Sequence, residues 1–122
     1  MATGKQIGEF SMKSTSLTLT PGLGGSTAIA GNFEGTATGF GVIVGTGIFV
    51  GGKSGTFSYC GAAYLDDGES NTAAGTGTYE SVGKHRWRTV GILQLLDGRA
   101  LVSEGEVDLA SRSWKGTLFE KN

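Results

Sequence analysis

The sequence is poor in the residues that most often cross-link small proteins or carry out their chemistry. It has one cysteine, Cys60, so no internal disulfide bond can form, and we expect a cytoplasmic protein in a reducing compartment. It has one histidine, His85, and no second histidine or cysteine at ligand spacing, so no metal site is expected. A single proline, Pro21, and the lack of a Gly-X-Y period exclude collagen.

Long apolar runs and a strong net charge are also missing. No apolar run approaches the roughly 20 residues of a membrane helix, and residues 1–13 hold no stretch suited to a signal peptide, so we expect no membrane segment. The net charge is only −1, which gives no electrostatic reason to expect nucleic-acid binding. Because apolar clusters nevertheless recur from end to end, the chain is not expected to be disordered.

Glycine is abundant, at 23 of 122 residues, and it separates short stretches rich in Val, Ile, Thr, Phe and Tyr. No segment keeps a helical period for eleven residues, so the pattern is typical of a meander, sandwich or barrel. The length suits one domain over residues 1–122. We predict an all-β fold, a closed antiparallel up-and-down barrel of about eight strands. The predicted strands are 5–20 (one bent strand or two), 27–38, 41–50, 54–65, 72–81, 84–96, 100–110 and 113–120.

The hairpin over residues 84–109 has the most clearly predicted register. A three-residue turn with Gly98 left-handed lets the pairing run back regularly from the turn. The pairs are Leu93–Leu101, Trp87–Val107 and His85–Leu109 on one face, and Arg88–Glu106 and Arg86–Asp108 on the other. A shift by one residue would mix the apolar and charged faces. We therefore expect His85 and Trp87 inside the barrel and the charged side chains outside.

The expected inward face also contains glycines. Gly91 and Gly105 lie on it in the hairpin, and Gly75 and Gly77 share a face with Tyr79 in strand 72–81. The missing side chains either bring sheets close together or leave a cavity, and small barrels use such a cavity to hold one small ligand. The sequence leaves these two interpretations open.

Residues 44–57 read Val-Gly-Thr-Gly-Ile-Phe-Val-Gly-Gly-Lys-Ser-Gly-Thr-Phe. This run resembles the central hairpin of the allene oxide cyclase and dirigent-like barrels, and it is similar to small bacterial calycin-like proteins of uncharacterised families. Gly-Thr-Gly-Thr at residues 75–78 fits those bacterial families as well. The resemblance covers roughly residues 30–80 and rests mostly on turn glycines.

The resemblance implies a calycin-like, eight-stranded antiparallel barrel with an apolar cavity, often assembled as a dimer or trimer. It implies binding, cyclisation or isomerisation of a hydrophobic small molecule. It supplies no catalytic residues that match this chain, so candidate chemistry has to be read from the residues themselves.

His85 is the main candidate for acid–base chemistry, because an imidazole inside an apolar barrel can act as a general base near neutral pH. The alternative is a residue at the barrel mouth with one structural hydrogen bond. Tyr59 and Tyr79 could each polarise a ligand carbonyl through the hydroxyl, although buried tyrosines often need only one structural partner. The ligand-binding candidates on the same inward faces are Trp87, Thr89, Ser103 and Phe57.

Other residues give weaker signals. Glu104, Glu106 and Asp108 share a face, which could suggest glycosidase chemistry, but opposite two arginines they are more typical of a solvated charge ladder. Cys60 alternates away from Tyr59 and is expected to be an inert thiol. No helix follows Gly45-Thr46-Gly47, so nucleotide binding is rejected and no cofactor is expected.

Three functions remain open. The first is a cofactor-free isomerase, cyclase or lyase that moves a proton on an apolar substrate. The second is a non-catalytic carrier of a hydrophobic ligand in the same cavity. The third is a structural or assembly protein in which glycines serve close packing. An enzyme needs His85 inside, a carrier needs an apolar cavity without it, and a structural protein needs no cavity of the roughly 300 Å³ typical of ligand sites.

Overall fold

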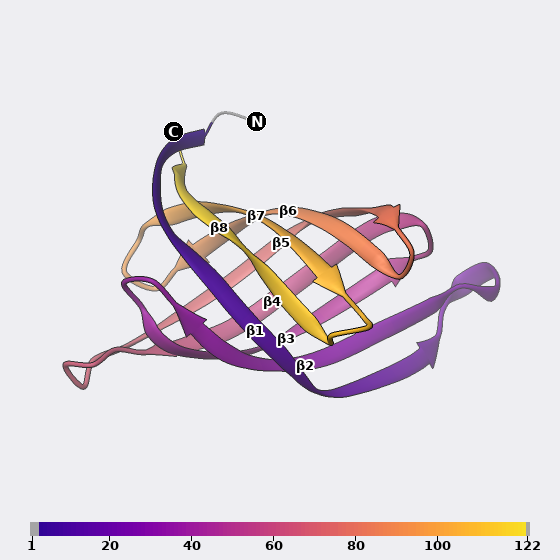
Figure 1. The fold of residues 1–122 in the computed structure, drawn as a ribbon, viewed down its shortest axis with the longest axis horizontal. Coiled ribbons are helices and arrows are strands. Elements are labelled where there is room, and N and C mark those ends of the chain that lie inside the picture. Colours follow the sequence, from indigo (N-terminus) through magenta and orange to yellow (C-terminus); the bar gives the residue numbers. More distant parts are fainter. Residues whose placement is uncertain (1–2, 122) are drawn as a thin grey trace.

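The structure of the protein, a computed structural model, describes residues 3–121. Eight antiparallel strands follow one another in chain order around a closed barrel (Figure 1), as the sequence predicts. The strands are β1 (Thr3–Pro21), β2 (Thr27–Ala37), β3 (Gly41–Gly51), β4 (Ser54–Tyr64), β5 (Ser70–Gly83), β6 (Arg86–Leu95), β7 (Ala100–Asp108) and β8 (Ser113–Lys121). A 3-10 turn, η1 (Leu23–Gly25), joins β1 to β2.

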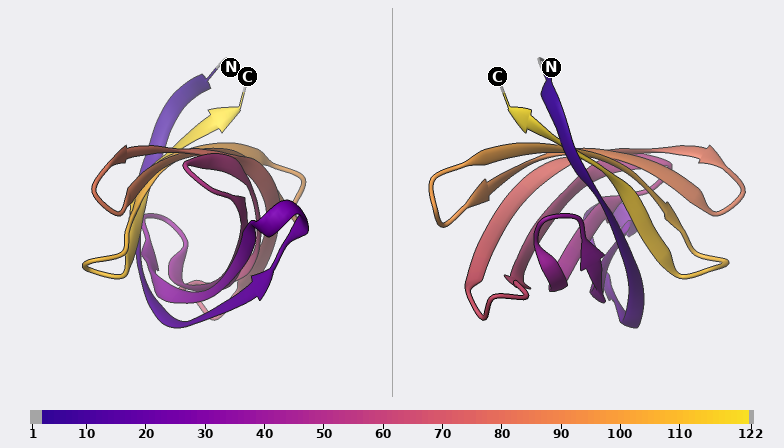
Figure 2. Two further views of the ribbon diagram at one scale, coloured as in Figure 1. Left: turned by 90° about the vertical axis from the view of Figure 1, so that its right-hand side faces the viewer. Right: turned by 60° about the vertical axis from the view of Figure 1, so that its left-hand side comes forward.

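The first predicted strand is one strand with two irregularities rather than two strands. β1 pairs with β8 along its first part and with β2 along its second, and the register shifts near Gln6 and between Ser14 and Ser16. The left view in Figure 2 shows the strands curving into a closed ring, and Figure 1 shows the β1–β2 hairpin projecting at one end of the barrel. No helix within residues 3–121 is long and apolar enough to cross a membrane.

The β6–β7 hairpin has the predicted register. Trp87 pairs with Val107, and Leu93 pairs with Leu101. Its turn is also as predicted, because Gly98 has a φ of 98°, a left-handed conformation that glycine adopts freely. The alternation of apolar and charged side chains along these two strands was therefore sufficient to predict which residues pair.

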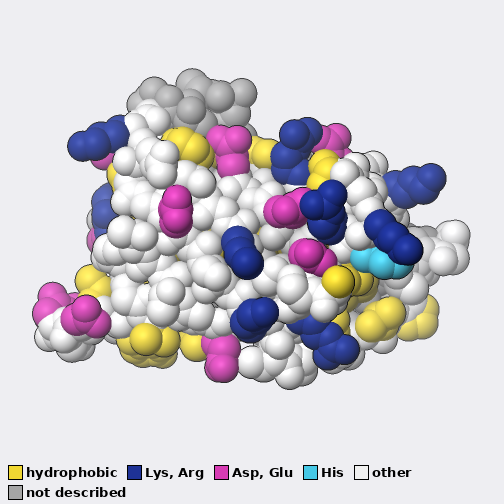
Figure 3. Space-filling view, in the orientation of Figure 1, with side chains coloured by type: hydrophobic (Ala, Val, Ile, Leu, Met, Phe, Trp, Pro, Cys, Tyr) yellow, Lys and Arg dark blue, Asp and Glu magenta, His cyan; other side chains and the backbone are white. Residues whose placement is uncertain are grey.

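The charged side chains of this hairpin lie outside the barrel, as expected, but the ion pairs predicted between Arg88 and Glu106 and between Arg86 and Asp108 do not form. Arg86 reaches Glu106 at 3.7 Å, and Arg88 pairs with Glu80 of β5. Asp108 instead accepts a hydrogen bond from the Ala110 backbone N–H at 2.9 Å. Acidic and basic side chains are interspersed over this face of the molecule (Figure 3). Exposed pairs of this kind contribute little to stability.

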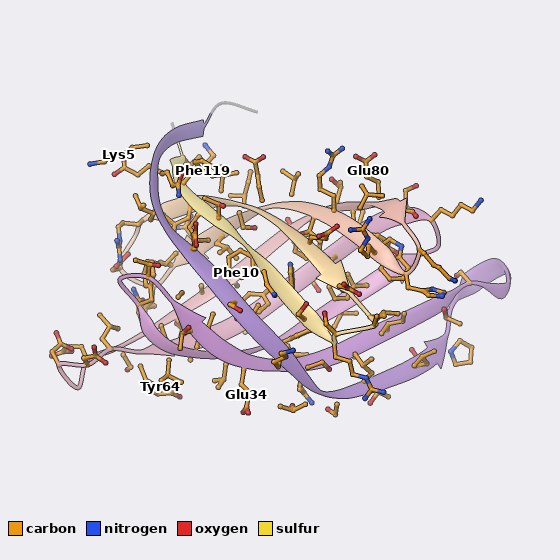
Figure 4. All side chains as sticks on the ribbon, viewed as in Figure 1. Lys5, Phe10, Glu34, Tyr64, Glu80 and Phe119 are labelled. Atoms are coloured by element: carbon orange, nitrogen blue, oxygen red, sulfur yellow. The ribbon has the colours of Figure 1, made fainter. Side chains whose placement is uncertain are left out.

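The core is built around one tryptophan from the last strand. Trp114 is 3% exposed, and it contacts five other aromatic rings at centroid distances of 5.3–6.3 Å. The rings are those of Phe10, Phe33, Phe49, Phe57 and Tyr59. Figure 4 shows Phe10 within the outline of the barrel, whereas Glu34, Tyr64 and Glu80 project outside it.

Aromatic rings also occupy the space left by the inward glycines. Gly77 and Gly91 are paired across β5 and β6, and a Cβ on either would lie within 2.8 Å of the Phe57 ring. Gly45 and Gly61 are paired across β3 and β4, and a Cβ on either would collide with the Tyr59 phenol. The glycine-rich face is therefore largely packed, because rings lie directly on the backbone of cross-strand glycine pairs.

Candidate functional site

The interior holds two cavities separated by a layer of aromatic side chains. The layer consists of Trp114, Phe33, Phe49 and Phe57, with neighbouring ring centroids 5.3–5.6 Å apart. One cavity lies toward the β2–β3, β4–β5 and β6–β7 turns and has a volume of about 90 Å³; we call it the Ser103 cavity. The other lies toward the opposite turns and has a volume of about 200 Å³; we call it the Trp87 cavity.

The Ser103 cavity is almost entirely apolar. Its walls include Phe10, Met12, Phe40, Leu95, Leu101 and Leu118, which come from four of the strands and the β2–β3 turn. All six side chains are buried. Such a lining excludes ions and favours a small uncharged molecule.

Four of the lining residues are polar: Asn71 and the exposed Thr72 near the β4–β5 turn, and the more buried Tyr59 and Ser103. Ser103 is 6% exposed, and its hydroxyl has no hydrogen-bond partner among residues 3–121. The Tyr59 hydroxyl has only a long contact of 4.0 Å to the Met12 sulfur, a weak acceptor. Both groups can therefore donate to a ligand oxygen without first breaking a protein hydrogen bond of normal strength.

Burial changes the acidity of one of these groups. Burial, together with the nearby Cys60, raises the pKa of Tyr59 to about 12. The phenol is therefore neutral at physiological pH and can donate a hydrogen bond but cannot act as a base there. Tyr59 is the only titratable side chain among the described residues that line the Ser103 cavity.

A polar cluster covers the turn end of the Ser103 cavity. The Arg99 guanidinium lies 5.3 Å from the ring centroid of Phe40 and 3.0 Å from an Asp97 carboxylate oxygen. Asn71, which also lines the cavity, donates to Asp97 at 3.0 Å. The hydrogen bond from the Arg99 side chain, more than any other contact, lowers the pKa of Asp97. These contacts hold Phe40 across the end of the cavity.

The Trp87 cavity is larger, and a greater share of its lining is polar. Tyr79 and Trp87 line it, so the predictions that both face the interior are confirmed. Burial raises the pKa of Tyr79. The exposed Arg112, in the β7–β8 turn, lies at its edge. Leu17 and Ile29 of the projecting β1–β2 hairpin complete the wall.

Thr89 faces inward, as predicted, but it has a structural partner. It is fully buried, and its hydroxyl accepts a hydrogen bond from the Trp114 indole N–H at 3.1 Å. It is absent from the lining of both cavities. Thr89 therefore orients the central ring of the aromatic layer, and the layer in turn forms the floor of the Ser103 cavity.

The prediction that His85 points into the barrel is wrong. Its carbonyl accepts a hydrogen bond from the Leu109 N–H at 3.1 Å, which agrees with the predicted position of His85 opposite Leu109. However, His85 lies in the β5–β6 turn with a φ of 56°, and this left-handed conformation turns its side chain into solvent. The imidazole is visible on the surface in Figure 3 and lines neither interior cavity.

The seven predicted site residues are therefore divided between different places. Phe57, Tyr59 and Ser103 line the Ser103 cavity, Tyr79 and Trp87 line the Trp87 cavity, Thr89 lies in the core, and His85 lies in a surface turn. The acids Glu104 and Glu106 are exposed, as is Cys60, which agrees with their expected outward positions. No three His, Cys, Asp or Glu side chains gather into a possible metal site within the described part of the chain.

Sequence reasoning missed Trp114 and Phe40. Trp114 had a usable signal, because Trp114, Gly116 and Leu118 alternate along one face of the last strand exactly as inward residues do. Phe40 had none, because it lies in the β2–β3 turn, where alternation does not apply. Comparison of the chain with protein-family models, with curated proteins and with solved structures found no match.

Proposed function

We propose that the protein is a non-catalytic binding protein for a small, uncharged, mostly apolar molecule that carries one hydrogen-bond acceptor, such as a ketone. The observation that carries this proposal is the pair of hydroxyls, Ser103 and Tyr59, that line a mostly apolar cavity without a normal protein acceptor. A hydroxyl in such a place can donate to a ligand oxygen without giving up a normal protein hydrogen bond.

The size of the ligand follows from the volume. An apolar cavity of about 150 Å³ can hold benzene, whereas sites for drug-sized ligands begin near 300 Å³. The Ser103 cavity, at about 90 Å³, suits a molecule of a few carbon atoms or a small ring. Most of the binding free energy would come from removing the ligand's carbon atoms from water.

Binding is better supported than acid–base catalysis. Proton transfer near neutral pH needs a group whose pKa lies in that range. The Ser103 cavity offers Tyr59, whose pKa is about 12, and His85 lies outside it. The resemblance of residues 30–80 to the allene oxide cyclase-like barrels agrees with a hydrophobic ligand, but the cavity supports binding of such a ligand rather than its cyclisation.

The proposal can be tested with cyclopentanone and its hydrocarbon analogue cyclopentane. The two indole N–H signals in a nuclear magnetic resonance titration report on different places, because Trp114 lines the Ser103 cavity and Trp87 lines the other one. We expect the Trp114 signal to shift to saturation with cyclopentanone while the Trp87 signal stays in place. A linear, unsaturable shift of both signals would contradict the proposal.

Substitutions separate the hydroxyl contribution from the cavity itself. Ser103→Ala and Tyr59→Phe should each weaken cyclopentanone binding about 2- to 10-fold, the worth of one hydrogen bond, and leave cyclopentane binding unchanged. Ala73→Leu, at a lining position, should abolish both. Its matched control is Ala74→Leu, at the next, exposed position of β5, which should bind as the wild type does.

A further inference from the structure

β1 extends beyond the strand that closes the barrel. Its pairing with β8 ends at Lys13 opposite Ser113, and the Ser14 N–H makes one more bond, to the Arg112 carbonyl, at 2.8 Å. Residues 16–21 pair with β2 on one side, and no strand within residues 3–121 pairs with their other side. Figure 1 shows this hairpin extending past the barrel, and in Figure 2, left, β1 is its outer strand.

The backbone groups on this open edge can be assigned from one hydrogen bond. The Gly22 N–H donates to the Ser26 carbonyl across the hairpin at 2.7 Å, so it points toward β2. Backbone direction alternates along a strand, so the groups of Thr18 also point toward β2. The N–H and C=O groups of Leu17 and Leu19 therefore point toward the open edge.

Between the bulge at Ser14 and Ser16 and the proline at position 21, the edge lacks the charged side chains that often prevent strand addition. No charged residue occurs between Lys13 and Glu34 in the sequence. The Leu17 and Leu19 side chains are 37% and 63% exposed. Soluble proteins commonly protect an edge with lysines or other inward charges, and an uncharged edge with exposed leucines is a template for another strand.

We propose that this edge pairs with the same edge of a second copy of the chain, antiparallel and centred on Thr18. In this register Leu17 faces Leu19 of the partner subunit, and the reverse pair is formed by symmetry. Each of these two pairs exchanges two backbone hydrogen bonds, which uses the outward groups of both leucines. Thr18 meets its own symmetry mate at the two-fold axis as a non-hydrogen-bonded pair.

The local sequence argues for a second copy rather than another extended peptide. Ser-Leu-Thr-Leu-Thr at residues 16–20 reads nearly the same in both directions, so reversal places leucine opposite leucine and hydroxyl opposite hydroxyl. This is the self-complementarity that a two-fold interface requires. The pairing also ends at natural limits, because Pro21 has no N–H and would face the bulge between Ser14 and Ser16.

The edge is held in shape before any partner arrives. On the outer face, Asn32 donates to the Ser16 hydroxyl at 2.8 Å and accepts from the Thr46 hydroxyl at 2.8 Å. These bonds link β1, β2 and β3, and the Thr15 hydroxyl donates to the Asn32 carbonyl at 3.3 Å. Little conformational entropy would then be lost when the edges pair.

Cysteine cross-linking tests the register in a Cys60→Ser background, which removes the exposed native thiol. Thr18→Cys places two thiols at the two-fold axis, where Cα atoms of a non-hydrogen-bonded pair are about 4.5 Å apart and a disulfide can form. Thr20→Cys is the matched control, because its symmetry mate lies several residues away. We expect rapid disulfide-linked dimers from Thr18→Cys and few from Thr20→Cys. Equal cross-linking of the two variants would overturn the proposed register.

Charge substitution tests the interface without a covalent bond. Thr18→Lys and Thr18→Glu each place like charges opposite one another, so each alone should sediment as a monomer. An equimolar mixture should recover the dimer mass of the wild type, and Thr20→Lys should remain dimeric. A wild-type chain that sediments as a monomer at every concentration, or single-charge variants that stay dimeric, would overturn the proposal.

Discussion

The indole N–H of Trp114 donates to the Thr89 hydroxyl at 3.1 Å, and both side chains are buried, at 3% and 0% exposed. This bond joins β8 to β6 across the barrel interior. It fixes the tryptophan that five other rings contact, so it fixes the layer that divides the interior. The floor of the Ser103 cavity therefore depends on one side-chain hydrogen bond.

Thr89→Val tests this bond, because valine keeps the shape of threonine and removes the acceptor. We expect the free energy of unfolding to fall by about 1–3 kcal/mol, the cost of leaving a buried donor unpaired. Thr76→Val, at an exposed position of β5, should change it by less than about 0.5 kcal/mol. Urea unfolding followed by circular dichroism measures both. Equal effects of the two substitutions would contradict a structural role for the bond.

Because the Phe57 ring packs on Gly91, the stability cost of a larger residue at position 91 should depend on the side chain at position 57. A Cβ on Gly91 would lie 2.8 Å from the Phe57 ring and 3.2 Å from the Thr76 carbonyl oxygen. Gly91→Ala should therefore lower the free energy of unfolding by about 1–3 kcal/mol, as overpacking does. The loss should shrink when Phe57→Leu is introduced first. Gly52→Ala, where a Cβ meets open space, is the control.

The raised pKa of Tyr59 predicts a loss of stability at alkaline pH. Because burial raises this pKa from an ordinary value near 10 to about 12, the folded chain holds the phenol proton more tightly than the unfolded chain does. Its contribution is therefore fully present below about pH 10 and is lost as the pH rises toward 12. Unfolding free energies measured over this range should fall more steeply for the wild type than for Tyr59→Phe. Parallel pH profiles would contradict the burial of this hydroxyl.

The position of His85 in a surface turn predicts that its imidazole is dispensable. Asparagine tolerates a positive φ, so His85→Asn removes the imidazole without new backbone strain. We expect the affinity for cyclopentanone to stay the same and the free energy of unfolding to change by less than about 0.5 kcal/mol. A large loss of affinity in the titration described above would restore His85 as a site residue.

The contrast between Trp87 and His85 shows where side-chain direction could be predicted from the sequence and where it could not. Alternation predicts side-chain direction as long as the backbone stays extended, and it placed Trp87 correctly. It failed two residues away, because β6 begins at Arg86 and the backbone of His85, in the preceding turn, is left-handed. The register was correct at both positions, so the error lay in the conformation of one residue.

The cavity could be predicted only in part, for a different reason. The sequence shows that Gly77 and Gly91 lack side chains on the inward face. It does not show where the Phe57 ring points, because that depends on its rotamer and on its neighbours across the sheet. Ring packing on glycine pairs leaves volumes of about 90 and 200 Å³, both below the roughly 300 Å³ typical of ligand sites, so the interior is neither fully packed nor widely open.

A crystal structure of the protein with cyclopentanone tests the central claim most directly. We expect the ketone in the Ser103 cavity, beneath Trp114, with its carbonyl oxygen about 2.7–2.8 Å from the Ser103 or the Tyr59 hydroxyl, the usual O–H···O distance. A Ser103 cavity that remains empty at saturating ketone, or a ketone seated only beside Trp87, would contradict the account.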